Sequence, residues 1–172
     1  LYESAIQVTP IDTLYSSISS REGFVPYAQL PQTYINAVIS AEDSRFTHHK
    51  GVDPVSIARA LVTDLRTGSF AEGGSTITQQ LAKNTLFTQE KHLARKAAEM
   101  FAALAIEKQY NKEQIFEMYV NTIYFGSGHY GIGEAAQGYF GKTPLQLTDA
   151  EAVMLAGLPN APSAYSPNSS PD

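Results

Sequence analysis

The sequence predicts a mainly α-helical fold, and three observations lead to this expectation. Apolar residues recur at helical spacing over several segments, and residues that favour helix N-termini precede those segments. Alternating patterns typical of β-strands are scarce. The chain has 172 residues, of which 43% are hydrophobic, and no internal repeat is visible. This length supports one hydrophobic core, so we expect a single domain over residues 1–172.

The first helix signals follow an N-terminal extension, residues 1–23. We expect irregular or short extended structure over about the first thirty residues. Pro31 stands where a first helical turn tolerates proline, and apolar residues follow at helical spacing as far as Ala41. Asp53 before Pro54 predicts an N-cap, and the helix that starts there should end near Gly68.

The middle of the chain predicts two more helices. Ser75 or Thr76 can cap a helix that runs through Leu81. The longest helix is expected from Glu90 to Gln109. Its apolar face should be formed by Leu93, Ala97, Met100, Phe101 and Leu104.

Two capping boxes mark helices in the last third of the chain. They are Asn111 with Gln114, and Thr148 with Glu151. Between them, residues 126–141 contain six glycines, and we expect a loop followed by a short helix. Residues 160–172 are rich in proline and serine and predict a flexible tail.

Charge and composition narrow the possible functions. The net charge of −5 and the pI of about 5.3 argue against nucleic-acid binding, so an anionic ligand would need a local basic cluster. Cysteine is absent, which excludes disulfides and thiolate zinc sites. Only 17% of residues are charged, which leaves room for apolar surface of the kind a membrane-facing protein needs. The chain lacks a membrane-spanning apolar run and starts at Leu1, so we expect an excised domain without its N-terminal anchor.

A pair of carboxylates, Glu42 and Asp43, ends the first apolar helix. A carboxylate beside apolar residues can serve as a general acid or base, although a solvated helix end is the plainer interpretation. His48 and His49 follow closely. A metal site needs more converging ligands than this stretch supplies, so packing histidines are the simpler expectation.

The stretch EGGSTITQQLAKN, residues 72–84, combines two glycines with neutral donors and one cation. Backbone N–H groups at such a helix start can hold an anion, and a lysine two turns later lies on about the same face. A phosphate, or a sugar plus a phosphate, would suit this set; an ordinary capped helix with a polar face would explain it equally well. The side chains concerned are Ser75, Thr76, Gln79, Gln80 and Lys83.

Lys91, Arg95 and Glu99 follow each other at intervals of four residues on the longest helix. They share a face nearly opposite the expected apolar stripe. The spacing alone favours an ordinary ion pair on a solvated surface. A cluster of tyrosines with one asparagine could line a sugar groove, or belong to the core and interfaces: Tyr119, Asn121, Tyr124, Tyr130 and Tyr139.

Taken in order, these motifs resemble the peptidoglycan glycosyltransferases, glycosyltransferase family 51. The segments that carry the resemblance are AEDSRFTHHKGVD, GGSTITQQLAKN, RKAAEM, EQIFEMYVN, IYFG and GHYGIGEAAQGYFGK. The resemblance covers roughly residues 24–167, and no transpeptidase motif accompanies it. The chain therefore looks like a monofunctional enzyme or the glycosyltransferase domain of a class A penicillin-binding protein.

The resemblance implies a lysozyme-like α-helical lobe and a smaller membrane-facing lobe with a cleft between them. The donor would be a glycan strand on undecaprenyl pyrophosphate, and the acceptor would be lipid II. The acceptor GlcNAc 4-hydroxyl would attack C1 of the donor MurNAc with inversion. The protein would then work at the outer face of a bacterial cell membrane, behind an N-terminal transmembrane helix and beside other cell-wall synthesis proteins.

The same resemblance assigns roles to residues. Glu42 matches the general base, and Glu99 matches a second carboxylate that could also orient a cation such as Mg²⁺ or Mn²⁺. Lys83 and Arg95 match positions near the pyrophosphate, and Lys91 lies where some members carry another basic residue. Substrate contacts are further implied for Asp43, Phe46, Ser75, Thr76, Gln79, Gln80 and Asn121. We expect no organic cofactor.

Residues 54–73 are expected to touch the membrane. Leu61, Leu65 and Phe70 could enter lipid while Arg59 and Arg66 meet headgroups. A plain packed helix followed by a loop is the alternative. Two other functions are kept as rivals: a hydrolase that cleaves peptidoglycan on the same type of fold, and a non-catalytic module that binds lipid or glycan.

Overall fold

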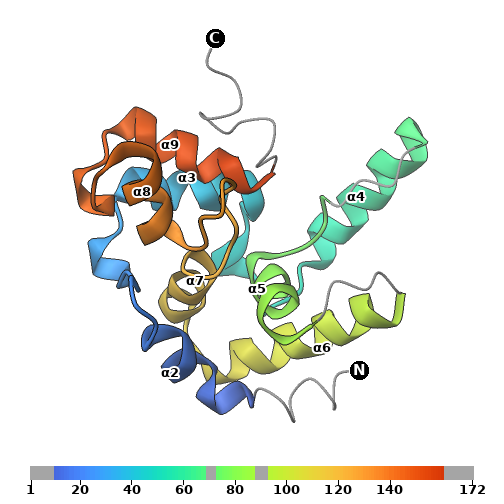
Figure 1. Ribbon diagram of the computed structural model, residues 1–172. Coiled ribbons are helices and arrows are strands. Elements are labelled where there is room, and N and C mark those ends of the chain that lie inside the picture. Colours follow the sequence, from blue (N-terminus) through green and yellow to red (C-terminus); the bar gives the residue numbers. More distant parts are fainter. Residues whose placement is uncertain (1–9, 69–72, 88–92, 161–172) are drawn as a thin grey trace.

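The computed structural model describes residues 10–68, 73–87 and 93–160 (Figure 1). The regular structure in these ranges is helical, and the β-pairing found there is an isolated bridge between Tyr124 and Tyr130. The prediction of a mainly α fold is confirmed. In the described residues, no helix has both the length and the apolar character that crossing a membrane requires.

The helices follow one another along the chain with short connections. The α-helices are α2 (Leu14–Ser19), α3 (Gln32–Glu42), α4 (Pro54–Thr67), α5 (Ile77–Leu86), α6 (Leu93–Gln109), α7 (Lys112–Val120), α8 (Ile132–Phe140) and α9 (Asp149–Gly157). Short 3-10 helices are η1 (Ile11–Thr13), η2 (Tyr27–Gln29), η3 (Phe46–His48), η4 (Pro144–Gln146) and η5 (Leu158–Asn160).

The expected N-caps at Thr76, Asn111 and Thr148 are confirmed, because each of these side chains accepts a hydrogen bond from the backbone N–H three residues later. Both halves of the capping box are present at α5, α7 and α9. Each box satisfies two N–H groups that would otherwise lack a partner at the helix start. The three boxes are Thr76 with Gln79, Asn111 with Gln114, and Thr148 with Glu151.

The expectation of irregular structure in the first thirty residues is wrong for residues 11–19, which form η1 and α2. Leu14 and Ile18 of α2 are buried in the core. Glu117 of α7 accepts the Tyr15 hydroxyl at 2.8 Å and the Tyr27 N–H at 2.7 Å. A six-residue helix shows too little periodicity to be recognised, and these distant contacts stabilise it. Residues 161–172, most of the expected flexible tail, lie outside the described residues.

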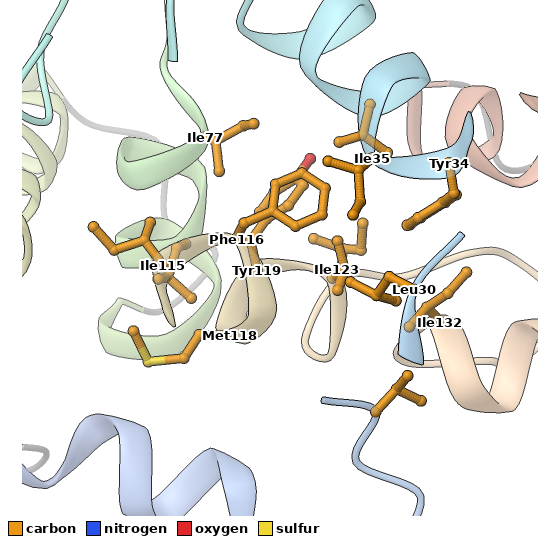
Figure 2. Close-up of a cluster of buried hydrophobic side chains, with 14 of the residues drawn as sticks. Leu30, Tyr34, Ile35, Ile77, Ile115, Phe116, Met118, Tyr119, Ile123 and Ile132 are labelled. Carbon is orange, nitrogen blue, oxygen red and sulfur yellow. The ribbon is translucent and has the colours of Figure 1, made fainter. Parts of the chain in front are cut away.

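The core is built around α7, whose residues 115–120 are all buried. Figure 2 shows Phe116 and Tyr119 of α7 among side chains from α3, α5 and α8. α3 packs against α9, and α5 packs against both α6 and α7. α4 extends away from this assembly in Figure 1, and α5 and α6 lie beside its base.

The expected apolar face of α6 is wrong. Phe101 and Leu104 are 61% and 48% exposed, whereas the buried positions are Ala98, Glu99, Ala102, Ala103 and Ile106. Small alanines on the buried face allow the helix to approach its neighbours closely. At Gly51 (φ +97°), a Cβ atom would lie 2.7 Å from the carbonyl oxygen of Ala103, so this contact requires glycine.

Candidate active site

A pocket of about 390 Å³ lies between α4, α5 and α6. α4 supplies an apolar wall, and α5 and α6 supply polar and charged side chains. The lining residues are Ile57, Ala60, Leu61, Gly74, Ser75, Gln79, Gln80, Lys83, Arg95, Lys96, Glu99 and Met100. Two motifs that are separate in the sequence, the GGSTITQQLAKN stretch and the RKAAEM stretch, therefore meet at one site.

The start of α5 is held by hydrogen bonds within the protein. The Thr76 hydroxyl donates to the Gly51 carbonyl at 2.6 Å and accepts from the Gln79 N–H at 3.1 Å. The Gln79 side-chain oxygen accepts from the Thr76 N–H at 3.0 Å. Both side chains are buried, so they shape this edge of the pocket from within. Whether either also contacts a substrate stays a prediction.

α4 is anchored by Asp53, whose carboxylate accepts hydrogen bonds from the Ser56 hydroxyl at 2.7 Å and the Val55 N–H at 3.1 Å. Arg45 Nε lies 3.0 Å from the same carboxylate. Burial raises the pKa of Asp53, but the two hydrogen bonds and the guanidinium outweigh it, so the net shift is downward. The charged form of Asp53 therefore stabilises the base of the α4 wall.

Cations gather around one buried carboxylate on α6. Glu99 is 2% exposed; one of its oxygens lies 2.9 Å from Arg95 Nε, and the other lies 3.5 Å from Lys96 Nζ. Lys96 Nζ also donates to the Ser75 hydroxyl. Lys83 lines the same pocket from α5, and it forms no ion pair within the described ranges. Three cations against one carboxylate leave the pocket with net positive charge.

Glu42 ends α3 and connects to the pocket through Gln80. Gln80 Nε2 donates to one carboxylate oxygen of Glu42 at 2.9 Å. The other oxygen is buried and has no hydrogen-bond partner among the described residues. The Tyr119 hydroxyl donates to Gln80 Oε1 at 3.2 Å. A carboxylate held in place in this way can act as a general base toward a substrate hydroxyl.

Asp43, next to Glu42, is bound within the protein. It accepts from His49 Nε2 at 2.9 Å and from the Ile77 N–H at 3.0 Å. His49 Nδ1 accepts from the Gly51 N–H at 3.1 Å, so the ring carries its proton on Nε2. These bonds join the end of α3 to the start of α5. His49 packs and hydrogen-bonds, as the sequence predicted.

Two other residues for which substrate contacts were expected lie in the core or at its edge. Phe46 is buried beneath Lys112, whose Nζ lies 4.5 Å from the ring centroid. Asn121 accepts from the Val25 N–H at 2.8 Å and donates to the Val25 carbonyl at 2.9 Å. Their proposed substrate contacts stay predictions, and Lys91 lies outside the described residues.

The tyrosine cluster divides between the core and the surface. Tyr119 is buried, and the Tyr139 hydroxyl donates to the Phe125 carbonyl at 2.9 Å. Tyr124 and Tyr130 are exposed, with ring centroids 4.8 Å apart. The cluster therefore does not form one groove.

Lys96 is a charged residue of the pocket that the sequence analysis missed. It lies three residues before Glu99, and this spacing on a helix was a usable signal. The spacing alone favoured a solvated Arg95–Glu99 surface pair, but Glu99 is buried and both residues line the pocket. The partnership of Gln80 with Tyr119 was also missed, and no local pattern indicates it.

The described residues contain no group of three side chains that could bind a metal ion. Both oxygens of Glu99 face cations. This donor set does not fit a divalent ion held by the protein alone, because such ions need several free oxygen ligands.

Comparison with known proteins identifies the family. The transglycosylase family model matches residues 9–172. Over 155 residues the chain is 48% identical to penicillin-binding protein 1A of Aquifex aeolicus, a match that covers 90% of this chain and 21% of that protein. It is 45% identical over 155 residues to penicillin-binding protein 1A/1B of Bacillus subtilis, covering 90% of this chain and 17% of the relative.

A third relative is penicillin-binding protein 1A of Escherichia coli, which is 50% identical over 139 residues, covering 81% of this chain and 16% of that protein. The chain spans about a fifth, or less, of the length of these relatives. The family model nevertheless covers nearly the whole chain. The chain therefore belongs to the transglycosylase family and is a peptidoglycan glycosyltransferase domain.

Proposed function

We propose that this domain polymerises lipid II into glycan strands by inverting glycosyl transfer. Family membership supports glycan polymerisation in general. The cation cluster carries the more specific proposal, because Gln80 lines the same pocket and joins this site for an anionic leaving group to Glu42, the candidate base. The donor is a strand on undecaprenyl pyrophosphate, and the acceptor is lipid II.

Glu42 is proposed as the general base. The acceptor 4-hydroxyl of GlcNAc loses its proton to the carboxylate of Glu42 as it attacks C1 of the donor MurNAc. The C1–O bond to the lipid pyrophosphate breaks, and the anomeric configuration inverts. The Gln80 hydrogen bond to one carboxylate oxygen supports this role, since it restricts the carboxylate to one orientation.

Lys83, Arg95 and Lys96 are proposed to stabilise the leaving pyrophosphate. Negative charge develops there as the bond breaks, and positioned cations lower the barrier most where charge develops. Glu99 orients two of these cations, as the 2.9 Å and 3.5 Å contacts indicate. This set favours transfer from a pyrophosphate over hydrolysis of a neutral glycan, which offers no such group.

The expectation that the domain uses a divalent cation is separate from these roles and stays a prediction. Because the donor set around Glu99 does not fit Mg²⁺ or Mn²⁺, we assign no step to either ion. Polymerisation by metal-depleted enzyme in excess chelator, compared with enzyme given Mg²⁺ or Mn²⁺, tests this point.

The membrane is proposed as the surface on which the domain works, at the outer face of the cell membrane. Leu61 and Leu65 of α4 are 57% and 86% exposed, and Phe101 of α6 is exposed as well. A packed helix would hide these side chains, so the apolar surface supports contact with lipid. This location places the pocket beside the lipid-linked substrates. Contacts with other cell-wall synthesis proteins are a further expectation.

The test is incubation of the purified protein with labelled lipid II in detergent, beside Glu42→Gln. We expect lysozyme-sensitive polymer from the wild type and none from the variant, which should still fold and bind lipid II. Release of fragments from polymeric peptidoglycan would favour the hydrolase instead. Binding without polymer under any condition would favour the non-catalytic module, and a fully active Glu42→Gln variant would refute Glu42 as the base.

A further inference from the structure

We infer that Tyr119 is a positioning residue that fixes the side-chain amide of Gln80 and, through it, the carboxylate of Glu42. This inference rests on the proposed function, because it concerns the residue proposed as the general base. It assigns to Gln80 a role within the protein, whereas the sequence analysis expected a substrate contact. It also gives a specific role to Tyr119, which the sequence analysis named only as one member of the tyrosine cluster.

Three helices meet in this chain of hydrogen bonds. Glu42 ends α3, Gln80 lies on α5, and Tyr119 lies on α7. The Tyr119 hydroxyl donates to Gln80 Oε1 at 3.2 Å, and Gln80 Nε2 donates to Glu42 at 2.9 Å. The separations along the sequence are 39 and 38 residues, so only the packing of the three helices brings the groups together.

Hydrogen-bond chemistry selects the direction of the whole chain. An ionised carboxylate only accepts, so the amide must turn its NH₂ group toward Glu42. The amide oxygen then faces Tyr119, whose hydroxyl must donate to it. Without the Tyr119 hydroxyl, the Gln80 amide keeps its hydrogen bond to Glu42 but can rotate more freely about its last side-chain torsion. The position of the Glu42 oxygen would then be less restricted.

Tyr119 is well suited to hold a partner in place. The residue is fully buried, and Figure 2 shows its ring inside the core cluster. Burial, with the nearby carboxylates of Glu42 and Asp43, raises the pKa of Tyr119 well above its ordinary value. The hydroxyl therefore keeps its proton and remains a donor at neutral pH.

The chain also contains a matched control. Tyr34 of α3 is fully buried in the same cluster, but its hydroxyl has no hydrogen-bond partner among the described residues. Burial raises the pKa of Tyr34, as it does for Tyr119, and the nearby Tyr119 and Glu42 raise it further, so the two hydroxyls share similar electrostatic surroundings. Tyr34→Phe and Tyr119→Phe each remove one phenolic oxygen from this core, and of the two only Tyr119→Phe removes a hydrogen bond to Gln80.

The experiment measures kcat and KM for lipid II polymerisation in the wild type, both phenylalanine variants, Gln80→Met and the double variant Tyr119→Phe/Gln80→Met. We expect Tyr119→Phe to lower kcat about tenfold, which corresponds to about 1.4 kcal/mol of barrier, with KM changed less than about twofold. Tyr34→Phe should change neither constant by more than about twofold. Gln80→Met should lower kcat without raising KM, and adding Tyr119→Phe to it should cause no further loss.

Several outcomes would overturn the inference. They are equal kcat values for the two phenylalanine variants, additive losses in the double variant, or a rise in KM as the main effect of Gln80→Met. The last result would indicate a direct substrate contact, and it does not depend on how well Tyr119→Phe folds. A wild type that makes no polymer under any condition would refute the proposed function and this inference with it. Polymer from the wild type, with no difference between the phenylalanine variants, would refute this inference alone.

Discussion

Replacing Glu99 by glutamine should separate the electrostatic role of the pocket from its structural role. The carboxylate is 2% exposed and faces Arg95 at 2.9 Å and Lys96 at 3.5 Å. Glutamine keeps the shape and one acceptor oxygen but leaves both cations without a negative partner. Removing one partner of a buried ion pair costs about 3–5 kcal/mol, and the partial exposure of Arg95 and Lys96 reduces this figure here. We therefore expect the free energy of unfolding to fall by about 1–3 kcal/mol.

Thermal unfolding and lipid II polymerisation measure the two consequences. In a domain of this size each kcal/mol shifts Tm by about 2–4 °C, so Glu99→Gln should lower Tm by about 2–12 °C. Well below that Tm, polymerisation should still fall at least about tenfold, because Arg95 and Lys96 are no longer oriented.

Glu107→Gln is the matched control for this prediction. Glu107 lies on the same helix, and one of its oxygens accepts from Lys112 and from the Thr78 hydroxyl, each at 2.6 Å. It does not line the pocket. We expect Glu107→Gln to lower Tm but to retain polymerisation. An unchanged Tm for Glu99→Gln, or equal activity losses in the two variants, would refute the reasoning.

Three further predictions concern the cations, α4 and the membrane. Lys83→Ala should raise KM for the lipid-linked donor and lower kcat without lowering Tm, because Lys83 lines the pocket without a described ion pair. A lower Tm with unchanged kinetic constants would contradict this prediction. Asp53→Asn should lower the free energy of unfolding by about 1 kcal/mol near neutral pH. The folded-state pKa of Asp53 lies below its ordinary value of 3.8. The stability difference between wild type and Asp53→Asn should therefore persist above pH 3.8 and vanish as the pH falls through the folded-state pKa. Urea unfolding at several pH values measures this difference. Leu65→Glu should weaken binding to anionic lipid vesicles about tenfold or more, with little change in Tm, since the Leu65 side chain is 86% exposed. Sedimentation with the vesicles measures this binding, and an unchanged result would argue against α4 as the membrane contact.

Local signals predicted the helix boundaries well. The capping boxes at Thr76, Asn111 and Thr148 depend on partners three residues away, so the sequence shows both halves of each interaction. The residue types of the site could also be predicted, because Glu42 and Lys83 belong to motifs that the resemblance explains. Their hydrogen bonds and their convergence could not be predicted in this way.

Where short-range sequence patterns were weak or misleading, the tertiary structure decided which side chains are buried. On α6 the large apolar residues Phe101 and Leu104 suggested a core face, yet the alanine-rich side is buried. Close approach to Gly51 and α5 requires small side chains, and this requirement depends on neighbours that lie far away in the sequence. For the same reason Glu99 faces the pocket and not the solvent.

The residue composition of the site is thus a property of the motifs, whereas its geometry is a property of the packing. Local hydrogen bonds and periodicity determine where α3, α5 and α7 begin and end, and the mainly α class follows from them. The contacts among Glu42, Gln80 and Tyr119 arise only when these three helices pack together. A hydrogen bond acts over about 3 Å, so groups nearly forty residues apart can form one only after the fold has brought their helices into contact.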